Sequence, residues 1–314
     1  MKKTLLFYML AAGLFSACST AQATTPAALE PTQSTPPSPT AALVIPSPSA
    51  SPTATLPAFT PAPAPTSPDP ASWKTWSVIP TLSPQMLDVY VKGQNLGRDV
   101  HVVSVVGDCE SSSDWFLKDF SKDERFYKLG PYTNLQSTID HFKASLGYRS
   151  YAALRGATAS TVLSPLWADP QACESGETPL ACEYRLHNPA FAFIALGTND
   201  IHKREQFEPQ MREIIEYTLE QGIIPILVTK ADNLEGDESI NQSIARLAVE
   251  YRVPVWNFWA AVQPLPGHGL QEDGAHLTFA PNFFDDPQNL EGAWAIRNLT
   301  ALQVLDAILA EVQE

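Results

Sequence analysis

The 314-residue sequence has little positive charge. Its 20 Lys and Arg residues stand against 34 Asp and Glu residues, which leaves a formal net charge of −14. No stretch resembles the basic groove of a nucleic-acid-binding protein, so we do not expect nucleic acid as a partner. The HxxH, HExxH and paired CxxC spacings that are typical of metal sites are also missing, and we predict neither a metal nor a cofactor.

Near the amino terminus, a mainly apolar run at residues 5–17 follows Lys2 and Lys3. At 13 residues it is too short to span a bilayer, but it fits the apolar core of a signal peptide, for which about 7–15 residues suffice. The run ends in Ser16-Ala17-Cys18, which resembles the bacterial motif for lipidation of a cysteine. We therefore predict a lipoprotein signal peptide at residues 1–17. An ordinary secretory signal cleaved nearby is the alternative.

Residues 19–72 are poor in charge and in large apolar side chains. They hold 14 of the 28 prolines, and Glu30 and Asp69 are their only charged residues. Such a composition cannot bury enough apolar surface to offset the entropy lost on ordering, and its prolines favour extended conformations. We predict a disordered linker at residues 18–72 and one folded domain at residues 73–314.

Cysteines are few. Apart from Cys18, the chain has Cys109, Cys173 and Cys182. An export signal implies a compartment in which disulfides persist, and the polar loop between Cys173 and Cys182 is short enough to close as a ring. We predict that these two residues are bridged and that Cys109 is free. Two alternatives stay open, because connectivity cannot be read from a sequence. In one, the bridge involves Cys109, and in the other, all three cysteines are free thiols.

The domain alternates apolar runs with helical patterns. Continuously apolar runs, typical of strands buried on both faces of a parallel sheet, occur at residues 100–106, 190–196, 223–229 and 254–258, and we expect a short fifth strand at 150–154. Helical periodicity occurs at residues 133–146, 205–220, 238–251 and 292–313. This alternation predicts an α/β fold with a doubly wound sheet and helices on both faces.

Two polar turns follow predicted strands. Gly107-Asp108-Cys109 follows the first, and Gly197-Thr198-Asn199-Asp200 follows the run at 190–196. Ligands of doubly wound folds bind beyond the carboxyl ends of the strands. Both turns are therefore expected at one edge of the sheet, although about 90 residues separate them.

A third polar segment contains an aspartate and a histidine that can act together as a general base. "DGAH" places Asp273 three residues before His276. In a turn, that spacing lets the carboxylate bind one imidazole nitrogen while the other nitrogen faces a nucleophile. Acyl transfer needs such a pair beside a nucleophile and donors for the oxyanion.

Four segments together resemble the SGNH, or GDSL-type, esterases and acyl hydrolases. They are "VVGDCES", "LRGATAS", "LGTND" and "EDGAHLT", in the order of the four family blocks and over residues 101–280. The resemblance implies a flavodoxin-like three-layer α/β/α sandwich with a mainly parallel five-stranded sheet. It also implies Cys109, His276 and Asp273 as catalytic residues, with Cys109, Gly156 and Asn199 as donors to the oxyanion.

Cys109 departs from this pattern, because the family has serine there. A cysteine beside a histidine can be a working nucleophile. Alternatively the site is an inactive relic, or one of the serines at residues 111–113 has taken over. We therefore expect a lipid-anchored hydrolase of acyl esters, acting on an acylated glycan or lipid. The alternative is a degenerate lipoprotein that binds carbohydrate or cell-wall material.

The lipid anchor is the first testable prediction. Mass spectrometry of the mature protein should find an acylated Cys18 at its amino terminus, because the short apolar run and the small residues before Cys18 form the processing signal. Such a protein would be exported and attached to the bacterial cell membrane through Cys18, with the domain facing the outside or the periplasm. An unmodified amino terminus at another residue would contradict this.

Overall fold

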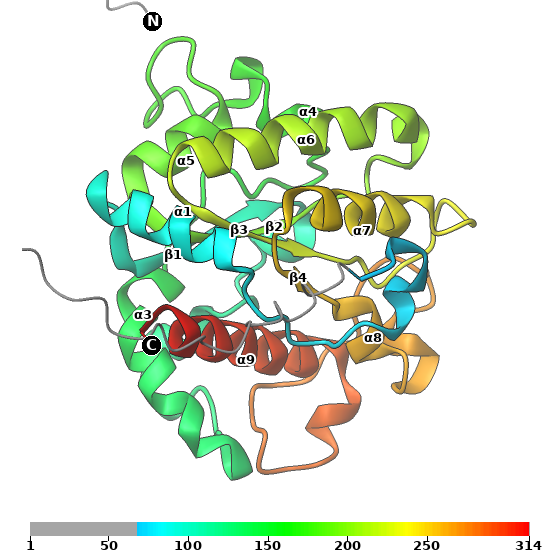
Figure 1. The fold of residues 1–314 in the computed structure, drawn as a ribbon. Helices are drawn as coiled ribbons and strands as arrows, with labels where there is room; N and C mark the ends of the chain where they lie inside the picture. Colours follow the sequence, from blue (N-terminus) through cyan, green and yellow to red (C-terminus); the bar gives the residue numbers. More distant parts are fainter. Residues whose placement is uncertain (1–67, 314) are drawn as a thin grey trace, which may run out of the picture. The chain divides into compact units, whose positions relative to one another are not determined.

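A computed structural model describes residues 68–313 (Figure 1). The predicted signal peptide, Cys18 and residues 18–67 of the predicted linker lie outside the described residues. The strands are β1 (Asp99–Gly107), β2 (Pro189–Ala195), β3 (Ile224–Val228) and β4 (Val255–Trp256). The α-helices are α1 (Pro84–Asn95), α2 (Cys109–Ser112), α3 (Gln136–Leu146), α4 (Ala159–Val162), α5 (Pro179–His187), α6 (Arg204–Glu220), α7 (Ser239–Tyr251), α8 (Phe258–Val262) and α9 (Ala293–Gln313).

The strands form one parallel sheet in the order β1-β2-β3-β4. Every residue of β3 is buried, and so is every residue of β2 except its last. Both faces of these strands are therefore covered, which is why their sequences are apolar throughout rather than alternating. The predicted α/β fold class is confirmed.

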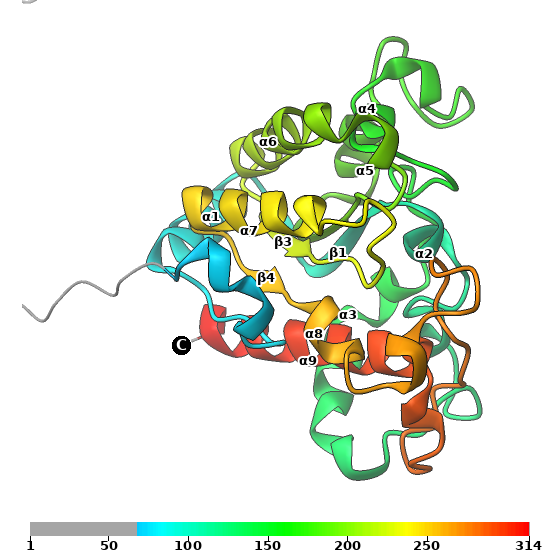
Figure 2. The ribbon, with the colours of Figure 1, turned by 90° about the vertical axis from the view of Figure 1, so that its right-hand side faces the viewer.

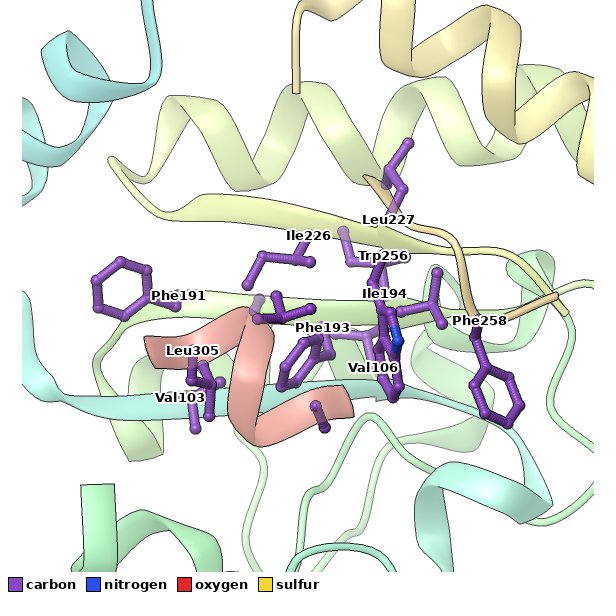
Figure 3. Close-up of a cluster of buried hydrophobic side chains, with 14 of the residues drawn as sticks. Val103, Val106, Phe191, Phe193, Ile194, Ile226, Leu227, Trp256, Phe258 and Leu305 are labelled. Atoms are coloured by element: carbon purple, nitrogen blue, oxygen red, sulfur yellow. The ribbon is translucent and has the colours of Figure 1, made fainter. Parts of the chain in front are cut away.

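Helices cover the two faces of the sheet. α5, α6 and α7 lie on one face, and α3 and α9 lie on the other (Figures 1 and 2). On the side of α9, Val103 lies beside Leu305, and Val106 and Phe193 lie near Trp256 (Figure 3). The indole N–H of Trp256 donates to Thr300 Oγ1 of the same helix at 3.1 Å, so even this large core side chain has its polar atom paired.

The predicted helices agree with α3, α6, α7 and α9 to within a few residues. Gly222 follows α6 with a φ of +70°, a conformation that suits glycine at a helix end. A Cβ there would lie 2.7 Å from the Cα of Gly93 in α1, so the close approach of the two backbones also requires glycine. Among residues 68–313, no helix is both long enough and apolar enough to cross a membrane.

The predicted fifth strand at residues 150–154 was wrong, and the described sheet has four strands. This segment makes a single parallel bridge, between Ala153 and Gly107. Side chains occupy the backbone groups that a longer ladder would use. Ser150 Oγ donates to the Val105 carbonyl at 2.5 Å, and the Tyr151 N–H donates to the buried Glu183 carboxylate at 2.7 Å. The segment therefore runs beside β1 without extending the sheet.

The predicted strand at residues 254–258 is shorter than expected. It ends at Trp256, and Phe258 begins α8. Asn257 is the reason, because its side-chain oxygen accepts from the Ala260 N–H at 3.3 Å and caps the helix. Its amide nitrogen donates to the carbonyl of Trp73 at 2.9 Å. Trp73 is buried in a 3₁₀ helix, Pro70–Thr75, which starts three residues before the predicted domain boundary.

Candidate active site

Three polar segments meet beyond the carboxyl ends of the strands. The turn after β1, the turn after β2 and the loop that precedes α9 line a cavity of about 200 Å³. Its lining residues are Asp108, Cys109, Glu110, Thr198, Asn199, Ile201, His202, Leu234, Ala275 and His276. Parallel pairing places the first two segments together, since the ends of β1 and β2 lie at the same edge.

The turn after β1 presents Cys109 as the first residue of α2. Asp108 caps this short helix, with its Oδ1 accepting from the Glu110 N–H at 3.2 Å and its carbonyl accepting from the Ser112 N–H at 2.9 Å. Cys109 is partly exposed and its thiol is free. The Cys109 side chain therefore lines the cavity from a helix start that is held in place by the preceding aspartate.

The three serines that follow Cys109 have other surroundings. Ser111 is buried, with its side chain packed against Gly107, where a Cβ on the glycine would collide with it. Ser112 Oγ donates to the carbonyl of Cys109 at 3.2 Å, and Ser113 Oγ accepts from the Trp115 N–H at 3.1 Å. None of the three lines the cavity that holds His276. The hydroxyl groups of Ser112 and Ser113 bond within the turn instead.

One backbone donor contacts the thiol, and a side-chain amide lines the same cavity. The Gly156 N–H donates to Cys109 Sγ at 3.3 Å, with Gly156 at a φ of +72° that suits glycine. The Asn199 amide nitrogen donates one hydrogen to the Ala157 carbonyl at 3.2 Å, which leaves its second hydrogen for another acceptor. No hydrogen bond among the described residues uses the Cys109 N–H. These are the three groups that the sequence named as donors to an oxyanion.

His276 and Asp273 form a hydrogen-bonded pair. His276 Nδ1 lies 2.6 Å from Asp273 Oδ2, and Asp273 Oδ1 accepts from the backbone N–H groups of Ala275 and His276 at 3.0 Å each. These bonds lower the pKa of Asp273 to about 2. The same carboxylate raises the pKa of His276, with weaker contributions from Glu110 and Asp108. The pair is exposed, and no hydrogen bond joins His276 to Cys109 within residues 68–313.

Next to the cavity, and sharing Asp108 and Glu110 with its lining, lies a group of buried charges that the sequence analysis missed. Asp108, Glu110 and the Arg297 side chain from α9 line a second cavity of about 30 Å³. Burial raises the pKa of Asp108 to about 7 and also raises that of Glu110, while the Arg297 guanidinium opposes both shifts. Glu110 stands next to Cys109, and Arg297 is the only cation in α9. In the sequence, the available signals were the position of Glu110 beside Cys109 and a single cation in a mainly apolar helix.

The turn after β2 is fixed by buried polar groups. Thr198 Oγ1 donates to Asp232 Oδ2 at 2.7 Å, and the Lys230 ammonium binds Asp232 at 2.6 Å and Glu235 at 2.5 Å. Asp200 Oδ1 accepts from the Ala159 N–H at 3.0 Å, which ties this turn to the segment after Gly156. The position of Asn199 therefore depends on a network that no single motif contains.

The remaining site residues lie as follows. A disulfide with an S–S distance of 2.03 Å joins Cys173 to Cys182, which lies within α5, and neither residue lines the cavity. His202 lines the cavity, whereas the ring of His141 bonds the Val100 carbonyl at 2.9 Å. The bridge is the pairing that the sequence predicted, and it leaves Cys109 as a thiol.

Comparisons with known proteins find no more than remote structural similarity. No family model matches the chain, and no curated protein matches it. Among solved structures, it is similar to a GDSL-like lipase from Bacteroides thetaiotaomicron, with 15% identity, a TM-score of 0.41 and coverage of 70% of this chain and 98% of the lipase. It is also similar to a variant of an acetyl xylan esterase from Geobacillus stearothermophilus, with 14% identity, a TM-score of 0.38 and coverage of 66% and 94%.

The geometry of the His276–Asp273 pair generates a prediction. In the Cys109→Ala background, which leaves His276 without a thiol at the same cavity, His276 should titrate above its ordinary pKa because the Asp273 carboxylate stabilises the imidazolium. Adding Asp273→Asn should lower the midpoint of this titration. The replacement of the exposed neighbour, Glu272→Gln, is the control and should leave the midpoint nearly unchanged. NMR titration of the ring, assigned with His276→Ala, measures all three proteins, and an unchanged midpoint in Asp273→Asn would refute the pairing.

Proposed function

We propose that the chain is an SGNH-type hydrolase of acyl esters in which Cys109 is the nucleophile and His276 the general base. The observation that carries the proposal is one cavity lined by a free thiol, an imidazole and a side-chain amide. The contact of the Gly156 N–H with the Cys109 sulfur adds to it, because a donor at the nucleophile is close to where the oxyanion forms. An acylated glycan or lipid is the proposed substrate class.

Acylation follows from these positions. His276 takes the proton of the Cys109 thiol, and the resulting thiolate attacks the acyl carbonyl, so that a C–S bond forms and the carbonyl oxygen becomes an oxyanion. The N–H groups of Cys109 and Gly156 and the free hydrogen of Asn199 stabilise that charge. Collapse of the tetrahedral intermediate breaks the ester C–O bond, and His276 protonates the departing alcohol.

Deacylation uses the same groups. His276, again neutral, takes a proton from water, and the hydroxide attacks the thioester carbonyl. The C–S bond then breaks, the acid leaves and Cys109 regains its proton from His276. Asp273 remains ionised throughout, because its folded pKa of about 2 lies far below neutral pH. Its role is to orient the imidazole and stabilise the imidazolium.

Cysteine at position 109, where the resembled family has serine, favours a second candidate function. A thiol at this position is compatible with a degenerate lipoprotein that binds carbohydrate or cell-wall material without turning it over. The paired Asp273 and His276 weigh against this candidate, because a binding module has no use for an oriented base. For either candidate we also propose export and a lipid anchor at Cys18, supported by the amino-terminal sequence.

The nucleophile assignment predicts a pattern of variants. Cys109→Ala should abolish hydrolysis of p-nitrophenyl acetate, and Asn199→Ala should reduce kcat about 100-fold because one oxyanion donor is lost. Cys109→Ser should keep activity or gain it. Ser113→Ala is the control, since Ser113 only caps a turn, and it should stay within about twofold of the wild type.

Two results would contradict the assignment. Full activity of Cys109→Ala would exclude Cys109 as the nucleophile. A wild-type protein that is inert on every ester tried, together with an active Cys109→Ser variant, would instead support the degenerate binding protein. Alkylation of Cys109 by iodoacetamide should slow in His276→Ala, because the group proposed to take the proton of the thiol is gone.

A further inference from the structure

Glu110 connects the two halves of the candidate site. Its Oε1 accepts from the N–H of Leu277 at 3.3 Å, across 167 residues of sequence. Glu110 directly follows Cys109, and Leu277 directly follows His276. Within residues 68–313, this is the only hydrogen bond that joins α2 to residues 271–278. The carboxylate therefore bridges the segment of the nucleophile and the segment of the base.

The Glu110 side chain is placed for this contact by its surroundings. Its second oxygen, Oε2, is buried and has no hydrogen-bond partner. The buried guanidinium of Arg297 attracts the carboxylate and lines the same 30 Å³ cavity. Unlike an apolar side chain of similar size, a carboxylate can accept the Leu277 N–H, which would otherwise be buried without a partner.

Arg297 is itself held in one position. Its guanidinium lies over three aromatic rings, with centroid distances of 4.8 Å to Phe116, 5.4 Å to Trp256 and 5.0 Å to Phe258. Such cation–π contacts are strongest where water is excluded, and Arg297 is only 4% exposed. The counter-charge for Glu110 is therefore supplied by the core of the sheet rather than by a mobile surface side chain.

We propose that Glu110 is a positioning residue, which fixes the His276 loop against the Cys109 turn through its bond to the Leu277 N–H. An effect of Glu110 on catalysis rests on the proposed function, whereas the hydrogen bond between Glu110 and Leu277 does not depend on it. His276 is exposed, and its loop bends sharply at Gly274, with a φ of +68°. The other hydrogen bonds of residues 271–278 lie within the loop or run to Gly269 and the start of α9, and none of them reaches the Cys109 turn. A shift of about 1 Å in such a base can lower the rate about 100-fold.

The pKa of His276 is a second quantity that tests the proposal, because three carboxylates raise it. Asp273 binds the imidazole directly, and Glu110 and Asp108 act at longer range, all in the direction that raises its pKa. Glu110→Gln removes one charge but keeps an oxygen that can accept the Leu277 N–H. Glu110→Ala removes both the charge and the acceptor. The pair of variants thus separates the positioning role of Glu110 from its charge.

The test compares Glu110→Ala, Glu110→Gln and the control Glu272→Gln, which removes a charge from the exposed part of the same loop. Hydrogen exchange of the Leu277 amide should accelerate at least about tenfold in Glu110→Ala and stay protected in the other two, since a lost hydrogen bond opens the amide to solvent. The Thr278 amide, bonded to the Gly269 carbonyl at 2.8 Å, is the internal reference.

On p-nitrophenyl acetate, kcat/KM should fall about 10- to 100-fold in Glu110→Ala only. The midpoint of His276 should fall in both Glu110 variants.

Unchanged Leu277 exchange in a folded Glu110→Ala variant would overturn the proposal. Equal losses of Leu277 protection in Glu110→Gln and Glu110→Ala would also overturn it, because the amide keeps the acceptor. If Glu110→Ala does not fold, Glu110→Met takes its place as a variant of similar volume without an acceptor. If the wild type hydrolyses no ester, the proposed function fails, and Leu277 exchange still decides whether Glu110 holds the loop.

Discussion

The candidate site depends on the parallel pairing of β1 with β2. Register places Val106 opposite Ile194 and Gly107 opposite Ala195, so the two strands end together. The turns that carry Cys109 and Asn199 therefore begin at the same level, although the intervening chain forms helices and a disulfide-bonded loop on the outside. The buried faces of both strands prevent a shift of register, because any shift would displace the apolar side chains that α9 and α6 cover.

Parallel pairing alone does not bring His276 to the site. The segment at residues 271–278 belongs to no strand of the sheet. Backbone hydrogen bonds tie it to Gly269 and Trp294, but its contacts with the Cys109 turn depend on side chains. Charges buried next to the cavity supply these contacts: Arg297 in its aromatic surroundings attracts Glu110, and Glu110 binds the backbone beside His276. The core of the sheet and the exposed His276 are thus linked through Glu110, whose buried carboxylate the charge of Arg297 attracts without a direct hydrogen bond between the two side chains.

The sequence predicted the parts of the fold that local patterns determine. Continuous apolar runs identified β1, β2 and β3, and four spaced motifs identified the turns around Cys109, Gly156, Asn199 and His276. The errors came where a distant side chain competes for backbone groups. Glu183 takes the Tyr151 N–H, so residues 150–154 do not become a strand. The short β4 is a local exception, because Asn257 directly follows the strand and caps the adjacent α8. Glu110 and Arg297 were missed because their partners are far away in the sequence.

The central claim is that Cys109 forms a covalent acyl intermediate. The most direct test is mass spectrometry of the protein quenched in acid soon after it is mixed with p-nitrophenyl acetate, followed by mapping of the modified peptide. The account predicts one acetyl group on Cys109 as a thioester that hydroxylamine removes, and no such adduct in Cys109→Ala. Turnover of the ester with the acetyl group on a serine of residues 111–113, or turnover with no adduct on Cys109 at any quench time, would contradict it.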